Sequence, residues 1–197
     1  KTNCAAQCCA SSRNFAPFGK ISEHFAAEAR LVGGSLFHIH RDTRVTKNKT
    51  PYKTHAGAYF RQVRARHVHP PGFYLYTEYG ARQRVHERQY LAPRQRDLQH
   101  NSQAIVADPK RWKRLKNAKA LSTAGCKLVG DSLKRPPRGY DSEHPLVEDL
   151  KRKDFILAVA TTEEDALAPD FIERFTEFCK TAAPVSEFLT RALDLEW

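Results

Sequence analysis

The chain has 197 residues, of which 41% are apolar and 28% are charged, and its formal net charge is +11. This length suits one domain with a substantial core. The longest apolar run, residues 155–160, falls far short of the roughly 18 residues that span a bilayer, so the composition excludes a membrane-spanning chain and indicates a soluble globular one.

The N-terminal segment, residues 1–14, lacks the sustained apolar stretch of a secretory signal, and we expect it to be disordered. The chain contains five cysteines with no repeated Cys-x-x-Cys spacing, which favours neither a zinc ribbon nor a disulfide framework. We therefore expect a cytoplasmic protein in which Cys126 and Cys179 are packing residues.

The first half of the remaining chain predicts one helix followed by strands. Apolar residues at intervals of three and four indicate the helix, and alternating or β-forming residues indicate the strands, two of which should form a hairpin or meander. A second helical stretch is interrupted at Asp108 and Pro109, where Asp108 is suited to cap the following helix. The predicted elements are a helix over 15–30, strands over 35–40, 56–63 and 72–79, and a helical stretch over 94–119.

The second half predicts short elements and then two C-terminal helices. Phenylalanines at helical spacing give the last two helices an apolar stripe typical of core packing. The predicted elements are a strand over 127–133, a turn over 135–140, a short helix over 145–151, a strand over 154–161, and helices over 169–180 and 184–195. Strands followed by segregated helices predict an α+β fold, with residues 15–197 forming a single domain around an antiparallel or mixed sheet.

The most informative segment is a basic loop that follows the strand expected at 35–40. Five Lys or Arg residues stand within residues 41–53, and such charges cannot all be buried without partners. Such a loop has the composition of an oxyanion-binding site, because it combines arginine guanidinium groups, lysine charges and a tyrosine hydroxyl. Asp42 can orient one of the arginines. The candidate ligand-binding residues of this loop are Arg41, Arg44, Lys47, Lys49, Tyr52 and Lys53.

Three hypotheses for this loop follow from its residues. The first is a domain that binds an anionic small molecule or nucleic acid. The second is an enzyme in which Asp42 or His40 is the acid–base group and the arginines stabilise developing negative charge. The third is a structural or partner-binding module, in which a salt bridge between Arg41 and Asp42 holds the loop and the lysines are solvated.

Charge is distributed unevenly along the chain. Residues 1–154 carry 30 Lys or Arg against 13 Asp or Glu, whereas residues 155–197 carry 3 against 9. A basic body of this kind favours polyanions, although it also fits a solubilising surface partly neutralised by the acidic C-terminal helices. A second basic cluster contains Arg135 and Arg138, which line one cleft with the first cluster if the two fold together and otherwise belong to a rigid turn.

Metal binding and cofactors are not expected. The pairs His38/His40 and His67/His69 have a spacing compatible with metal, but no Glu or Cys stands at a recognisable spacing to supply a third ligand. The sequence also lacks a nucleophile elbow, a P-loop and a dinucleotide fingerprint.

Several motifs occur in a fixed order along the chain, at residues 33–37, 39–44, 47–54, 71–75, 103–106, 133–141, 144–145 and 151–155. In these motifs and in their order the chain resembles one known family, called domain of unknown function 2461. The resemblance implies a fold and a membership and no activity. The chain departs from the family at residues 1–14, where a helical segment rich in Asn, Trp and Phe is usual, and at 81–99, where a glycine-rich stretch is usual. We therefore expect the chain to be truncated or altered at its start.

Overall fold

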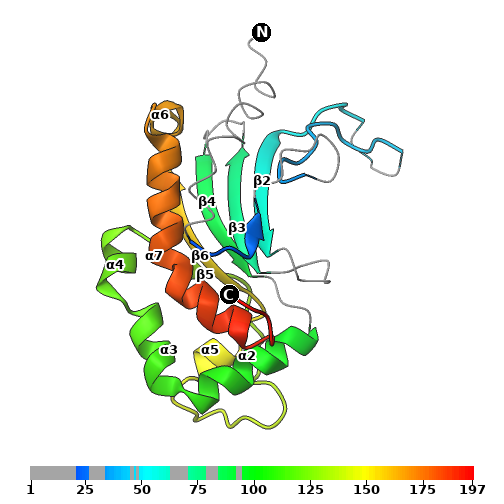
Figure 1. Ribbon diagram of the computed structural model, residues 1–197. Coiled ribbons are helices and arrows are strands. Elements are labelled where there is room, and N and C mark those ends of the chain that lie inside the picture. Colours follow the sequence, from blue (N-terminus) through cyan, green and yellow to red (C-terminus); the bar gives the residue numbers. More distant parts are fainter. Residues whose placement is uncertain are drawn as a thin grey trace.

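The computed structural model of the chain describes residues 21–26, 34–44, 47, 49–62, 71–78, 84–91 and 95–197 (Figure 1). The N-terminal segment expected to be disordered lies outside these residues. Across the described part of the chain, no helix has both the length and the apolar character needed to cross a membrane.

The described strands form one sheet in the order β1-β2-β3-β4-β6-β5, and every neighbouring pair is antiparallel. The predicted pairing of the strands over 56–63 and 72–79 is confirmed, because β2 and β3 are antiparallel neighbours, and β4 extends this pair into a meander. The strands are β1 (Phe25–Ala26), β2 (His55–Gln62), β3 (Gly72–Glu78), β4 (Arg84–Leu91), β5 (Lys127–Val129) and β6 (Phe155–Thr161).

The helices pack mainly on one side and at one end of this sheet (Figure 1), which confirms the α+β fold class. Asp108 caps α3 as predicted, since its carboxylate accepts a hydrogen bond from the Arg111 N–H at 3.0 Å. The helices are α2 (Gln95–Ala107), α3 (Pro109–Lys116), α4 (Lys119–Thr123), α5 (Val147–Leu150), α6 (Glu163–Leu167) and α7 (Phe171–Arg191).

The core lies between the sheet and α7. Phe60 of β2 and Phe175 of α7 are both buried, with ring centroids 5.9 Å apart. Trp112 of α3 closes the core from the end, edge-on to Phe155 at 5.6 Å. Because alternate residues of a strand point to opposite faces, the residues next to Phe60 in β2 lie on the sheet face away from α7.

The two predicted C-terminal helices are one continuous helix, so that prediction was wrong in its detail. Pro184 lies inside α7 and removes one backbone hydrogen bond. The buried stripe nevertheless continues across it, from Ala182 to Val185 and Leu189. Burial of this stripe against the sheet outweighs the local cost of the proline.

The sequence also misassigned two segments near the sheet. Within the expected helix over 15–30, the described residues 21–26 form a turn and then strand β1. Phe25 lies in the core there, with its ring centroid 5.4 Å from that of Phe73. Strand β4 was not predicted, because its residues are mostly charged or polar, yet its backbone pairs with β3 on one side and β6 on the other.

Candidate functional site

The basic loop is part of a hairpin arm, residues 34–54, that projects from the sheet (Figure 1). Residues 36–37 pair with the edge of β2, where the Phe37 N–H donates to the Gly57 carbonyl at 2.9 Å. Farther out, the arm pairs with itself: the Arg41 N–H donates to the Pro51 carbonyl and the Lys53 N–H to the Ile39 carbonyl. The predicted strand over 35–40 is therefore present only as isolated bridges, and the loop is an extended arm rather than a free coil.

An ion pair and a backbone contact brace the tip of the arm. Arg44 donates to Asp42 through Nε at 3.0 Å and Nη2 at 2.8 Å, and its backbone N–H also donates to Asp42 Oδ1. The side-chain hydrogen bonds from Arg44 hold the pKa of Asp42 below its ordinary value. Lys49 Nζ donates to the Thr43 carbonyl at 2.7 Å. Asp42 therefore orients Arg44, and the salt bridge considered between Asp42 and Arg41 is not the one formed.

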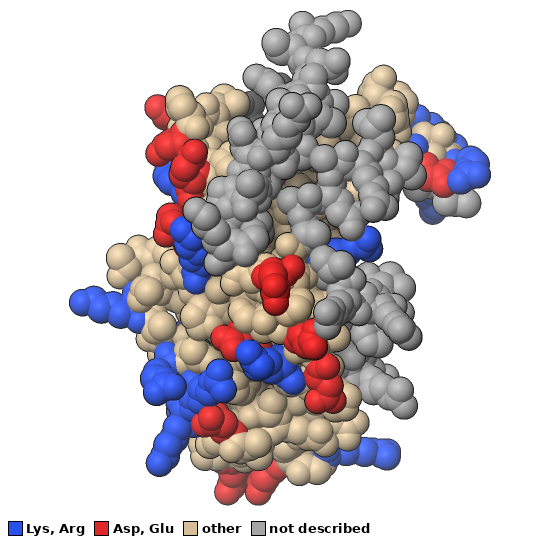
Figure 2. All heavy atoms as spheres, in the orientation of Figure 1, with Lys and Arg blue, Asp and Glu red and all other residues tan. Residues whose placement is uncertain are grey.

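Three cations of the arm are left without a counter-charge among the described residues. The side chains of Lys47 and Lys53 make no ion pair there, and Arg41 is half-buried with its Nε unpartnered. A buried donor without an acceptor costs free energy, more so on a charged group. In the space-filling view, basic side chains lie beside an acidic one on the arm (Figure 2).

Aromatic rings line the arm and the adjoining sheet face. The His40 and Tyr52 rings pack at 5.4 Å, and the Phe37 ring packs against Tyr74 of β3 at 5.8 Å. Beside Phe37 lies a hollow of about 270 Å³. Its described lining residues are Gly34, Ser35, Leu36, Phe37, His38, Tyr59 and Arg61.

The second predicted cluster does not join the first. Arg135 and Arg138 lie in the loop between β5 and α5, at the end of the molecule opposite the arm (Figure 1). The Tyr140 N–H donates to the Pro137 carbonyl, and Gly139 has a φ of +91°, so the segment is a tight turn. The structure gives these two arginines no common cleft with the described part of the arm.

Asp42 and His40, the acid–base candidates of the enzymatic hypothesis, both lie on the arm. Asp42 is held by Arg44, and neither Asp42 nor His40 lines the hollow beside Phe37. Within the described residues no group of three His, Cys, Asp or Glu side chains is placed to hold a metal ion. His67 and His69 lie outside those residues.

One family model, described as "Conserved hypothetical protein (DUF2461)", matches residues 12–188 of the chain. The chain belongs to this family. The match includes the whole arm and the six described strands of the sheet. No curated protein and no solved structure matches the chain.

This DUF2461 protein has a further basic surface that the motif search missed. Six Lys or Arg residues occur within residues 110–119, a density above that of the arm. Two of them are anchored: Arg111 lies over the Phe188 ring and Lys116 binds Asp149. The exposed cations of this segment gather over α3 (Figure 2). Their sequence signal is the high density of Lys and Arg within ten residues.

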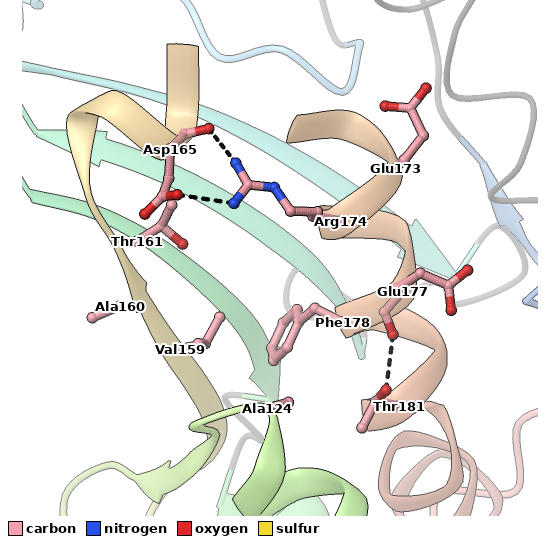
Figure 3. A pocket seen from close by; sticks show the side chains of 10 residues that line it. All are labelled: Ala124, Val159, Ala160, Thr161, Asp165, Glu173, Arg174, Glu177, Phe178 and Thr181. Carbon is pink, nitrogen blue, oxygen red and sulfur yellow. Dashed lines mark hydrogen bonds and ion pairs between the residues drawn. The ribbon is translucent and has the colours of Figure 1, made fainter. Parts of the chain in front are cut away.

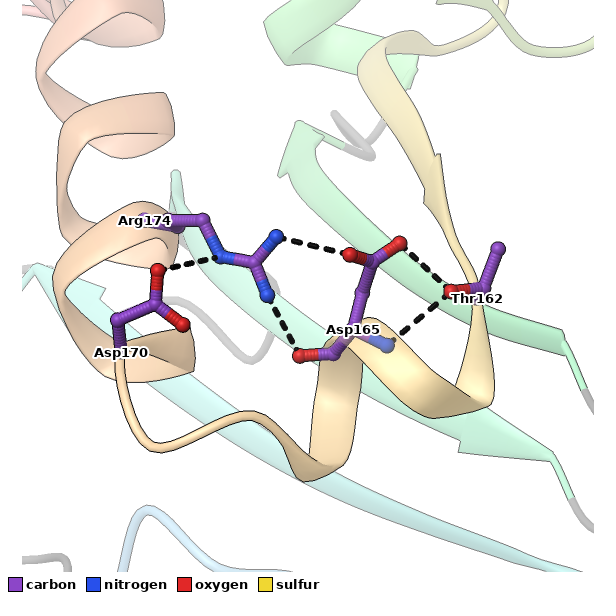
Figure 4. A network of polar contacts seen from close by, with 4 residues as sticks. All are labelled: Thr162, Asp165, Asp170 and Arg174. Atoms are coloured by element: carbon purple, nitrogen blue, oxygen red, sulfur yellow. Dashed lines mark hydrogen bonds and ion pairs between the residues drawn. The ribbon is translucent and has the colours of Figure 1, made fainter.

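A second hollow, of about 470 Å³, lies between β6, α6 and α7 of the DUF2461 protein (Figure 3). Arg174 projects into it from α7 and binds both the carboxylate and the backbone carbonyl of Asp165, at 2.9 and 2.7 Å. Thr162 caps α6 through Asp165, and Asp170 approaches Arg174 Nε at 3.4 Å (Figure 4). Because these groups satisfy one another, we assign the network to joining α6 and α7.

Proposed function

We propose that the arm binds an anionic ligand through Arg41, Lys47 and Lys53. The observation that carries the proposal is the pairing of Asp42 with Arg44, which leaves those three cations without an ion pair among the described residues. Like charges held close together on an exposed hairpin repel one another, and an anion relieves that repulsion.

The remaining polar residues of the arm have supporting roles in this proposal. Arg44 and Lys49 brace the tip through Asp42 and Thr43, on either side of Lys47 in the chain. Tyr52 is 57% exposed, and its ring packs against that of His40 at 5.4 Å. Arg135 and Arg138 belong to the loop between β5 and α5, and this proposal does not include them.

Binding of a dye-labelled inorganic polyphosphate, followed by fluorescence anisotropy over a range of NaCl concentrations, tests the proposal. The triple variant Arg41→Ala/Lys47→Ala/Lys53→Ala should bind at least about tenfold more weakly at low salt. The slope of log K against log[NaCl] should fall in magnitude by about 2, because three cation–phosphate contacts are lost.

The matched control is Lys110→Ala/Lys113→Ala/Arg114→Ala on α3, which changes the net charge equally. It should keep the salt slope of the unaltered protein. Equal losses in the two triple variants would show a response to net charge alone and would overturn the proposal. Lys47→Glu, paired with Lys113→Glu, repeats the comparison without altering half-buried Arg41.

A further inference from the structure

The arm exposes apolar rings as well as cations, and simple anion binding does not account for them. Two of the large apolar side chains that are exposed in the described residues are aromatic: Phe37, 42% exposed, and Tyr52, 57% exposed. Both lie on the arm, together with Ile39, which is 44% exposed. Leaving apolar surface in water is unfavourable, at about 25 cal/mol per Å². Exposed rings among cations therefore indicate a ligand that has both charged and planar apolar parts.

The structure holds the Phe37 ring in a fixed position. Its backbone is hydrogen-bonded to β2 and its ring rests on Tyr74, which in turn packs against Tyr59 at 6.2 Å and Tyr76 at 6.0 Å. A ring that is already ordered loses little conformational entropy when it stacks on a ligand.

Two glycines fix the tyrosines beneath Phe37. A Cβ atom at Gly57 would lie 2.6 Å from the Tyr74 hydroxyl, and one at Gly72 would lie 2.7 Å from the Tyr59 ring. Each tyrosine therefore lies across a glycine of the neighbouring strand, in a diagonal pair on the sheet face away from α7. The rings form a rigid platform that ends at exposed Phe37.

The hollow of about 270 Å³ beside this platform places an aromatic ring next to a cation. Phe37 and Tyr59 line the hollow together with Arg61, which is exposed. An aromatic ring stacks on a base, and a guanidinium binds phosphate or stacks on a base in turn. From this hollow the arm leads outward past Arg41 and Lys53 to Lys47.

We infer that the anionic ligand of the arm is a single-stranded nucleic acid, with a base stacked on Phe37 beside Tyr59 and Arg61 and with backbone phosphates facing Arg41, Lys47 and Lys53. The inference rests on the proposed function and adds to it the stacking of a nucleic-acid base on Phe37. The strand is single because a duplex keeps its base faces stacked on one another, whereas single strands offer them to protein rings.

The test compares three dye-labelled probes with the full chain: inorganic polyphosphate, a deoxythymidine oligonucleotide, and an abasic oligomer of the same length and charge. The oligonucleotide should bind about tenfold more tightly than the abasic oligomer, because stacking adds to the phosphate contacts. Phe37→Leu should remove this difference and leave polyphosphate binding unchanged, whereas Phe37→Trp should keep it. Leu167→Ala, which removes an exposed apolar side chain on α6, should change neither.

The possible failures are distinguishable. Equal binding of the oligonucleotide and its abasic counterpart would overturn the inference and leave the proposed function intact. A preference for bases that survives Phe37→Leu would also overturn it, as would Phe37-dependent binding to phosphatidylserine vesicles without any preference for bases. If none of the three probes binds, the proposed function itself is wrong.

Discussion

Arg44 closes a two-point ion pair on Asp42 at the tip of the arm, with Nε 3.0 Å from Oδ1 and Nη2 2.8 Å from Oδ2. The two residues are separated by Thr43 alone, and the Arg44 backbone N–H also donates to Asp42 Oδ1. Arg41, on the other side of Asp42, receives no such partner from the described residues. This choice of arginine decides which cations of the arm remain available to a ligand.

Replacement of Asp42 by asparagine separates binding from acid–base chemistry. The asparagine side chain keeps an oxygen that can accept the Arg44 backbone N–H, but the change removes a negative charge from the arm. We expect Asp42→Asn to tighten polyphosphate binding by roughly two- to fivefold at low ionic strength, measured by anisotropy, because a like charge is lost. Weaker or unchanged binding would mean that the carboxylate is needed to shape the arm.

The ion pair also predicts a shift that can be measured directly. Arg44 lowers the pKa of Asp42, so the pair contributes stability above the ordinary aspartate pKa and loses it as the pH falls through the lowered value. An NMR titration of the Asp42 carboxyl carbon should therefore give a midpoint below that of an ordinary aspartate. In Arg44→Ala the midpoint should rise toward the ordinary value; an unchanged midpoint would contradict the pairing.

Asp149 holds two cations at the junction of α3 and α5. It is 4% exposed, Lys116 Nζ lies 2.5 Å from its Oδ2, and Arg152 Nε lies 3.9 Å from its Oδ1. Asp149→Ala should lower the free energy of unfolding by about 3 kcal/mol, because both cations lose their buried partner.

Lys116→Met is the matched variant for this site. Arg152 still neutralises Asp149 in this variant, and methionine keeps an unbranched apolar side chain. In urea unfolding, Lys116→Met should therefore lower the free energy of unfolding clearly less than Asp149→Ala does. Equal costs would show that the loss in Asp149→Ala comes from packing and not from charge.

Pro184 lowers the stability of helix α7. The residue is exposed and inside the helix, where proline lacks the N–H that would donate to the Lys180 carbonyl. Pro184→Ala should raise the free energy of unfolding by roughly 1–2 kcal/mol, since the regained helical bond exceeds the greater freedom of the unfolded chain. Ala183→Ser at the neighbouring position is the control and should not stabilise the protein. A lower melting temperature for Pro184→Ala would show that the proline fits its place in the packed helix.

Cys126 should react slowly with alkylating agents. Burial raises the pKa of its thiol from 9.0 to about 11, so near neutral pH the thiolate fraction falls by about 100-fold. Peptide-resolved mass spectrometry after iodoacetamide treatment distinguishes Cys126 from fully buried Cys179. The Cys126 rate should approach that of a free thiol in urea, and rapid labelling in the native protein would contradict the burial.

The elements that the sequence predicted well are those whose signal is local. Asp108 and Pro109 mark the start of α3 because the capping carboxylate and the missing N–H act within one turn. Strands β2, β3 and β6 have β-forming residues in a pattern that identifies them without knowledge of their neighbours. The motif spanning the arm likewise identified the family before any fold was known.

Only the tertiary structure decided the remaining features, because each depends on partners distant in sequence. The mostly polar strand β4 is set by pairing with β3 and β6, and the continuity of α7 through Pro184 is set by burial against the sheet. Composition made the arm basic. Folding chose Arg44 as the partner of Asp42, kept Arg135 and Arg138 away from the arm, and placed the Phe37 ring on Tyr74. Charge counts lack this information, since the side-chain contacts of a hairpin depend on its register and on the sheet beneath it.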